Sequence, residues 1–333
     1  PDIFRMAAVA RARCHELISC LPLSSVSYAF AYGSGVIAQQ GENPADKMVD
    51  FIVCTRDATA FHSENLDRNP SHYSLARING VRQLVRIQSA AARVYYNTHI
   101  RVNQSLIKYG VVSDEDLRAD LLDWKWLYLA GRLQKPVLDV IEPSSSLLEC
   151  VVENRRSALQ AALLQLPDSF TLHQLFEEIV SLSYRGDFRM IIGEDKSKVQ
   201  KIVSGSLEAL DGIYRPFLLE DPRVEIQGNR IIQDASTNAV YHRLNLLPFS
   251  VVSSLQRRWN SRMRRMKDVE EVLFNLARHH DVSDQVREAV SSIVRASAFW
   301  QSAKNALTAG LARSLVYSAM KLGKWSRSLR SPT

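Results

Sequence analysis

The sequence lacks the long apolar run that a transmembrane helix requires. None of its stretches approaches the roughly 18 consecutive apolar residues needed to span a bilayer. We therefore expect no helix that crosses a membrane.

Cysteine is scarce and irregularly spaced. The chain has only Cys14, Cys20, Cys54 and Cys150, and no C-x-x-C pair occurs among them. This spacing argues against a zinc knuckle or a dithiol redox motif, and scattered free thiols fit a reducing compartment.

Several catalytic signatures are also missing. No Gly-Lys-Ser/Thr follows a glycine-rich loop, so the chain has no Walker phosphate-binding loop. The G-x-S-x-G elbow of many serine hydrolases is absent, and we find no organised Ser-His-Asp or Cys-His set. A hydrolase is therefore disfavoured.

Acidic residues are absent from positions 289–333. That segment carries seven basic residues: Arg295, Lys304, Arg313, Lys321, Lys324, Arg327 and Arg330. The other 35 Lys and Arg residues balance all 35 Asp and Glu residues, so the net charge of +7 belongs to this tail. A nucleic-acid binder more often carries its positive charge on the folded domain, and no nucleic-acid partner is expected. A basic tail suits an anionic membrane surface.

The tail also has an apolar stripe at helical spacing. Its members are Leu307, Leu311, Leu315, Leu322, Trp325 and Leu329. Together with the basic residues, the stripe is typical of an amphipathic helix lying in the plane of a membrane surface. An ordinary packing helix with a solvated basic face fits the same pattern.

Strands and helices are both predicted in the first 142 residues. β-type runs occupy residues 26–32, 48–55, 105–113 and 137–141, and helical patterns occupy 6–21 and 114–133. Ser113 stands where a helix N-cap is expected.

Beyond a candidate linker at residues 142–150, the pattern turns mainly helical. Apolar residues recur at helical spacing in 155–166, 171–184, 198–218 and from 251 onward. Gly228-Asn229 between two short alternating runs predicts a hairpin, and helices followed by a hairpin suggest a winged helix. We therefore expect an α+β protein with three parts: residues 1–142, 143–250 and 251–333.

A bare Gly33-Ser34-Gly35 follows the first predicted strand. It reads simply as a tight turn, but such a turn also offers N–H groups and a hydroxyl to phosphate oxygens. The next predicted strand carries Asp50 between apolar residues. This arrangement resembles the nucleotidyltransferase fold of the DNA polymerase β superfamily, in which strand carboxylates hold Mg²⁺ (magnesium) against a triphosphate.

The chain departs from that superfamily at one position. The superfamily usually has two acids two residues apart, and Met48 occupies the first place. Asp46, in the loop before the strand, is the preferred second metal ligand beside Asp50. Asp139, in the predicted strand 137–141, is the other candidate.

Six segments in order resemble one family, the mitochondrial phosphatidate cytidylyltransferases, also called mitochondrial translocator assembly and maintenance proteins. The segments are "FAYGSGV" with "MVDFIV", "FHSENLDRNPSHYS", "IKYGVVS", "LYLAGRLQKPV", "SYRGDFRM" with "GEDKSKVQKIV", and "KNALTAGLARSLVYSAMKLGK". The resemblance covers about residues 26–324.

This resemblance implies a reaction and a location. CTP and phosphatidic acid give CDP-diacylglycerol and pyrophosphate with the help of Mg²⁺, and the product feeds cardiolipin synthesis. The resemblance implies a peripheral enzyme on the matrix side of the mitochondrial inner membrane. It also implies a nucleotidyltransferase domain, then a winged-helix-like domain and a C-terminal helical segment.

The resemblance also suggests roles for individual residues. Gly33, Ser34 and Gly35 would cradle the CTP phosphates. Lys108 and Arg189 would be catalytic, with Arg189 and Lys198 facing the phosphatidate headgroup. The other expected nucleotide-binding residues are His62, Asn65, His72, Tyr109 and Lys135. Each has a plainer reading as a packing, turn-forming or helix-ending residue, and Arg189 could simply pair with Asp187.

Two alternatives differ in class. A nucleotidyltransferase acting on RNA or another soluble acceptor would keep the fold and change only the acceptor. A non-catalytic scaffold or import-maintenance factor would explain the missing acid at Met48.

Overall fold

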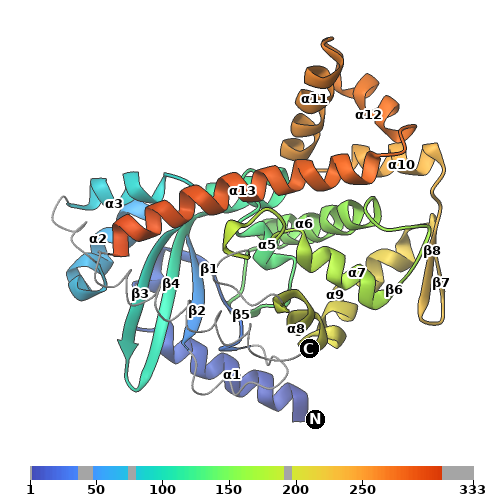
Figure 1. Cartoon of the computed structure of the whole chain (residues 1–333). Helices are drawn as coiled ribbons and strands as arrows, with labels where there is room; N and C mark the ends of the chain where they lie inside the picture. The colour runs from blue at the N-terminus through green and yellow to red at the C-terminus, as the bar shows by residue number, and fades with distance from the viewer. Residues whose placement is uncertain (1, 37–47, 74–79, 191–196, 310–333) are drawn as a thin grey trace.

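The computed structural model describes residues 2–36, 48–73, 80–190 and 197–309 and has an α+β architecture (Figure 1). One part is built on a five-stranded sheet in the order β3-β4-β2-β1-β5. Its strands are β1 (Val26–Tyr32), β2 (Val49–Thr55), β3 (Tyr95–Val102), β4 (Ser105–Ser113) and β5 (Leu138–Ile141). β2 and β4 run parallel, and the other neighbouring pairs are antiparallel.

Alternating residues of these strands divide the sheet into two faces. On one face Phe30 and Ile52 join a large core that extends into the helical part of the molecule. On the other face Ala31 and Phe51 pack with residues of α1 (Asp2–Ile18) and α2 (Ala58–Arg68). A third helix, α3 (Gly80–Gln88), packs beside α2. The two-residue period of the strands thus decides which side chains face which layer.

The helix predicted over residues 114–133 is not continuous. Ser113 caps α4 (Asp114–Asp123) as expected, but the chain then leaves the helix and resumes only in the short α5 (Ala130–Leu133). Trp124 and Leu127 have φ values of +50°. The cause is Asp120, whose carboxylate accepts hydrogen bonds from the backbone N–H groups of this turn and so replaces helical bonds.

The expected linker at 142–150 is mostly helix. Ser144 caps α6 (Ser145–Leu163), and Leu147 and Cys150 are buried in its first turns. Only the three residues 142–144 connect β5 to α6. The prediction went wrong because three consecutive serines resemble a linker, whereas here one of them is a cap.

The predicted hairpin is confirmed. β7 (Val224–Gln227) and β8 (Arg230–Gln233) pair around Gly228, and β6 (Ser169–Thr171) adds a third strand. The accompanying helices are α7 (Leu172–Ser181), α8 (Lys198–Gly205), α9 (Leu207–Glu220) and α10 (Thr237–Asn245). The winged-helix assignment stays a prediction.

The last described helices are α11 (Phe249–Met263), α12 (Val269–Ala277) and the long α13 (Val282–Ala309). Figure 1 shows α13 crossing from the helical part to the sheet. There Gln301 accepts a hydrogen bond from Ala92 N and donates one to Val94 O, and Lys304 Nζ lies 2.7 Å from Ala90 O. One hydrophobic core continues from β1 to α13. The domain boundaries expected at residues 142 and 250 therefore stay predictions.

Within the described ranges, no helix has both the length and the apolar character needed to cross a bilayer. The predicted basic amphipathic tail falls almost entirely at 310–333 and so lies outside the described residues. Asp46 lies outside them as well.

Candidate active site

The Gly-Ser-Gly turn packs against the start of β2. Gly33 has a φ of +79°, and its carbonyl accepts a hydrogen bond from Val36 N at 3.1 Å. A Cβ atom on Gly35 would lie 2.6 Å from the Met48 carbonyl oxygen, so only glycine allows this approach. A Cβ on Gly33 would lie 3.8 Å from Asp50 Oδ2. The turn and Asp50 therefore share one corner of the sheet.

Asp50 faces a lysine on the neighbouring strand. In the parallel pairing of β2 and β4, Asp50 is level with Lys108, and Lys108 Nζ lies 3.2 Å from Asp50 Oδ1. Lys108 Nζ also lies 4.6 Å from the ring centroid of Tyr96 on β3. Both charged side chains are partly exposed, so the pair is open to a ligand.

A second cation comes from the segment after the Asp120 turn. The guanidinium of Arg132 lies 5.1 Å from the ring centroid of Tyr32 and 4.3 Å from that of Tyr128. Burial alone would raise the pKa of Tyr128, but Arg132, Arg189 and Lys108 outweigh it and lower the pKa to about 8. A phenol with this pKa reports a strongly positive environment.

The position of this segment is set by Asp120. Its Oδ1 accepts from Trp126 N at 2.9 Å, and its Oδ2 accepts from Tyr128 N at 3.0 Å. Leu129 N and Ala130 N also donate to Oδ2. Burial raises the pKa of Asp120, while these N–H groups counteract the rise. One buried carboxylate thereby fixes the backbone that carries Tyr128.

Two more cations lie where the sheet part meets the helical part, Lys135 just before β5 and Lys198 at the start of α8. Lys135 Nζ donates to Ser183 Oγ at 2.9 Å and lies 5.1 Å from the Tyr184 ring centroid. Lys198 Nζ lies 5.2 Å from the same ring. Burial, followed by the charges of Arg132 and Lys198, lowers the pKa of Lys135 to about 7. The cationic cluster of Lys108, Arg132, Lys135 and Lys198 thus draws on both parts of the chain.

Arg189 follows the plainer of its two expected roles in this state. Its Nη2 lies 2.6 Å from Asp187 Oδ2, and its Nε donates to both carboxylate oxygens of Asp187. It still contributes positive charge at Tyr128. Arg189 is therefore held at the edge of the cationic cluster by its own acid.

Several polar atoms of this face are buried without hydrogen-bond partners. In the described part of the chain, the set includes Tyr32 Oη, Asp50 Oδ1, Tyr96 Oη and Arg132 Nε, each beside a polar or charged neighbour that makes no well-directed hydrogen bond to it. An unsatisfied buried polar atom is costly, and a group of them around one corner points to a ligand that completes their bonding.

The other predicted nucleotide contacts lie on the opposite face of the sheet. His62 Nδ1 bonds to Tyr73 Oη at 2.8 Å and His62 Nε2 to Gln88 Oε1 at 2.7 Å. Asn65 Nδ2 donates to Tyr73 Oη and to Tyr109 Oη, and His72 Nδ1 bonds to Tyr109 Oη. The structure does not bring this network together with Asp50 and Lys108.

The protonation states of this network agree with its burial. Desolvation lowers the pKa of His62 to about 4 and also lowers the pKa of His72. Because Gln88 Oε1 is an acceptor, His62 donates from Nε2 and accepts from Tyr73 at Nδ1. The network is therefore neutral at physiological pH.

Asp139 is occupied elsewhere. It lies level with Phe30 on β1 and accepts a hydrogen bond from Tyr28 Oη at 2.6 Å. Strand β1 separates β5 from β2. Among the described residues, no three His, Cys, Asp or Glu side chains form a cluster suited to a metal ion.

The sequence patterns did not identify the aromatic residues of the site. Tyr32, Tyr96 and Tyr128 come from two strands and a turn, and nothing in their local sequence links them. The sequence feature that pointed to this part of the site is the Arg132-x-x-Lys135 spacing, which puts two cations near the end of one predicted helix.

Comparison with known proteins identifies relatives along almost the whole chain. The family described as "Phosphatidate cytidylyltransferase, mitochondrial" matches residues 14–324. Curated proteins of that name include those of Caenorhabditis briggsae and Caenorhabditis elegans, which are 54% and 52% identical over 315 residues, covering 94% of this chain and 98% of each relative.

More distant relatives have the same name. The protein of Xenopus laevis is 40% identical over 322 residues, covering 95% of both chains. A solved nucleotidyltransferase-like protein from Exiguobacterium sibiricum is 11% identical to this chain, and the match covers 85% of this chain and 72% of that protein. Its TM-score of 0.22 is too low to indicate a shared fold. On the sequence matches, the chain belongs to the mitochondrial phosphatidate cytidylyltransferase family.

Proposed function

We propose that this protein transfers CMP from CTP to phosphatidic acid and releases pyrophosphate. An oxygen of the lipid phosphate attacks the α-phosphorus of CTP, a P–O bond forms to give CDP-diacylglycerol, and the bond to the β-phosphate oxygen breaks. Family membership supports this reaction. The carrying structural observation is the group of unsatisfied buried polar atoms beside the Gly33 turn, surrounded by cations.

The cationic cluster suits the charges of both substrates. A triphosphate and a phosphate monoester repel each other, so the site must neutralise them in order to bring them together. The backbone at Gly33, Ser34 and Gly35 is suited to hold the CTP phosphates. Lys108 and Lys135 would then neutralise them, with Arg189 on the side from which the lipid phosphate enters.

The carboxylate oxygens of Asp50 are of the kind that a magnesium ion binds. Mg²⁺ prefers oxygen ligands and is commonly held by one or two carboxylates together with substrate phosphates and water. Asp50 Oδ1 is buried and has no well-directed hydrogen bond within the described residues, and its charged neighbour is Lys108 Nζ at 3.2 Å. We propose Asp50 as a ligand and keep Asp46 as the second. When bound, Mg²⁺ would neutralise charge that develops on the phosphates.

We propose an indirect role for the network on the other face. His62, Asn65 and His72 would support Tyr109, and Tyr109 adjoins Lys108 on β4. The network would therefore stabilise the sheet beneath Lys108 and would not touch the nucleotide.

The cellular setting is also part of the proposal. We propose that the product serves cardiolipin synthesis and that the protein works as a peripheral enzyme on the matrix side of the mitochondrial inner membrane. The word mitochondrial in the relatives' names supports the organelle. The basic residues at 313–330 support binding of the tail to anionic lipid.

The deciding experiment is pyrophosphate release from CTP with phosphatidic acid vesicles and Mg²⁺. Release should require the lipid, prefer CTP to ATP and fall at least about 100-fold in Asp50→Asn. Asp168→Asn, which alters an exposed acid in the helical part, is the control and should retain activity.

Each other outcome has a defined meaning. Release that does not need phosphatidic acid would indicate a soluble acceptor. No CTP binding by a folded, lipid-bound protein would overturn the enzymatic proposal and favour a scaffold.

A further inference from the structure

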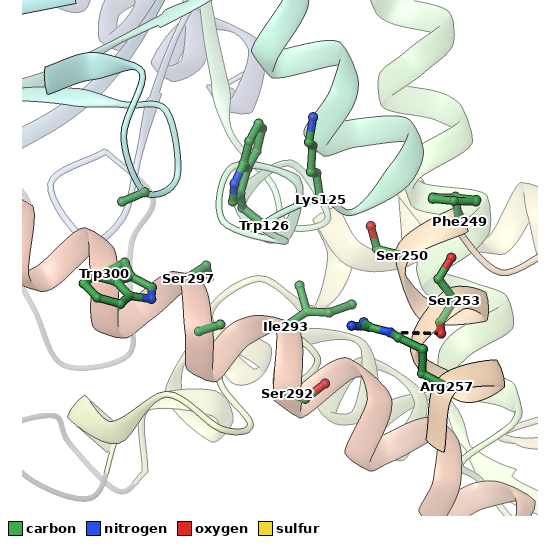
Figure 2. A pocket seen from close by; sticks show the side chains of 12 residues that line it. Lys125, Trp126, Phe249, Ser250, Ser253, Arg257, Ser292, Ile293, Ser297 and Trp300 are labelled. Carbon is green, nitrogen blue, oxygen red and sulfur yellow. Dashed lines mark hydrogen bonds between the residues drawn. The ribbon is translucent and has the colours of Figure 1, made fainter. Parts of the chain in front are cut away.

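A groove lies between α11, α13 and the turn that Asp120 holds. It has a volume of about 440 Å³. Figure 2 shows its walls: Lys125 and Trp126 from the turn, Phe249, Ser250, Ser253 and Arg257 from α11, and Ser292, Ile293, Ser297 and Trp300 from α13. None of the predicted catalytic or nucleotide-binding residues lines it.

Two large aromatic side chains of the groove are mostly exposed. Phe249 is 70% exposed and Trp300 is 63% exposed, although both lie on helices whose other faces are buried in the core. Phe299, next to Trp300, is also 55% exposed. Exposed aromatic residues gathered around a hollow commonly mark an interaction surface.

The charge of the groove has one sign. Its cations are Lys125 and Arg257, and none of its twelve lining residues is acidic. Serine hydroxyls from α11 and α13 border the same space in Figure 2. The guanidinium of Arg93 lies 5.7 Å from the Trp126 ring centroid, but it is paired with Asp116 at 3.7 Å and adds little net charge. This combination of aromatic, hydroxyl and cationic groups complements phosphate groups at a lipid surface.

We propose that this groove docks on an anionic phospholipid bilayer. Phe249 and Trp300 would enter the interfacial layer, while Lys125 and Arg257 would pair with lipid phosphates. None of the residues that line the groove belongs to the tail at 310–333. The choice of a bilayer rests partly on the proposed function, because phosphatidic acid resides in membranes.

The location of the groove supports this assignment. Trp126, in the groove, and Tyr128, in the candidate active site, are two residues apart in one turn, and Asp120 holds the N–H groups of both. A protein docked through the groove would therefore bring its cationic cluster close to the bilayer.

Single-stranded nucleic acid could use similar groups, since it also combines phosphates with stacking surfaces. It is disfavoured because the groove has only two cations, Lys125 and Arg257, among its lining residues. A polyanion would find no broad positive field there.

The test is flotation of the full chain with vesicles, without CTP. One set contains phosphatidylcholine alone, and the other also contains phosphatidylglycerol, which is anionic but is not the proposed substrate. The double variant Phe249→Ser/Trp300→Ser should bind roughly tenfold more weakly to the anionic vesicles. Lys125→Gln/Arg257→Gln should also bind roughly tenfold more weakly and lose much of the preference for them.

Matched controls alter exposed residues elsewhere. Leu219→Ser removes a 71% exposed apolar side chain from α9, and Arg230→Gln removes an exposed cation from β8. Neither should change binding. Native Trp300 should also contribute fluorescence that brominated lipid quenches, and Trp300→Phe should lose that component.

The proposal is overturned if the groove variants, shown to be folded by circular dichroism, bind vesicles as the native chain does. It is also overturned if single-stranded RNA binds more tightly than vesicles and the groove variants abolish that binding. Failure of the proposed catalysis would look different, because vesicle binding is measured without CTP. Turnover of a soluble short-chain phosphatidate should be unchanged in the groove variants.

Discussion

The two faces of the five-stranded sheet use polar residues in opposite ways. On one face, Asp50 and Lys108 form a partly exposed ion pair near buried atoms that lack hydrogen-bond partners. On the other, Tyr109, the next residue of β4, lies in a buried network in which its hydroxyl bonds to Asn65 and His72. Lys108 and Tyr109, adjacent residues of β4, therefore belong to a binding surface and to a buried network respectively.

This difference separates binding capacity from stability. A satisfied network contributes to folding and has little left to offer a ligand, whereas unsatisfied atoms beside charged groups gain most when a ligand arrives. Substitutions on the two faces should therefore change different measurements, and four experiments test this separation.

The largest effect is expected at Lys108. Lys108→Met keeps an unbranched apolar chain beside Tyr96 but removes the positive charge. We expect catalytic turnover to fall by about 100-fold or more, because the charge acts on the phosphates. The midpoint of thermal unfolding should change little. Lys201→Met, at an exposed position of α8, is the control, and a large loss of stability at Lys108 would contradict the assignment of this face.

The next effect is a pH dependence of stability from His62. Its folded pKa of about 4 lies below the ordinary value of 6.5, so the unfolded chain takes up the proton first as the pH falls. Stability from this group is present above pH 6.5 and is lost toward pH 4, by about 3 kcal/mol in total. Urea unfolding at both pH values measures it.

His62→Gln should lessen this pH dependence, although the variant itself is less stable at neutral pH. An unchanged dependence in the variant would assign it to other groups.

A smaller loss of stability is expected at Tyr109. Tyr109→Phe removes the hydroxyl that bonds to Asn65 and His72 and leaves their polar groups buried. The free energy of unfolding should fall by about 1–3 kcal/mol. Turnover measured well below the unfolding temperature should stay within a few-fold of native. A loss of turnover as large as that of Lys108→Met would mean that the two faces are not separable.

The smallest effect concerns Lys135. Its pKa of about 7 means that it loses its proton as the pH rises through neutrality, and a neutral amine attracts phosphate less. CTP affinity should therefore fall up to about tenfold from pH 7 to 9. Lys135→Arg should flatten this profile because arginine stays charged. Lys267→Arg is the control, and a native profile that is already flat would remove Lys135 from the site.

Local sequence predicted four strands of the five-stranded sheet and the hairpin, but it missed β3 and β6 and grouped the side chains poorly. The bounds of β1 and β4 and the hairpin at Gly228 follow from patterns within a few residues. The break after α4 does not, because apolar residues continue at helical spacing and only the carboxylate of Asp120, acting across ten residues, ends the helix.

The site itself shows the same limit. The Gly33 turn and Asp50 could be paired from sequence because neighbouring strands carry them. Arg132 and Tyr128 could not be placed beside them, since that depends on how the turn folds back. The sequence did show, however, that Lys108 and Tyr109 lie on opposite faces of the sheet, because side chains alternate along a strand.

The carboxylate of Asp120 also affects how variants of this protein should be interpreted. Its side chain lines neither of the proposed binding regions, yet it holds the backbone of both. A screen for lost turnover would score its substitution as catalytic, and a screen for lost vesicle binding would score the same substitution as membrane-binding. Only a measurement of both, beside a measurement of folding, would reveal an architectural residue.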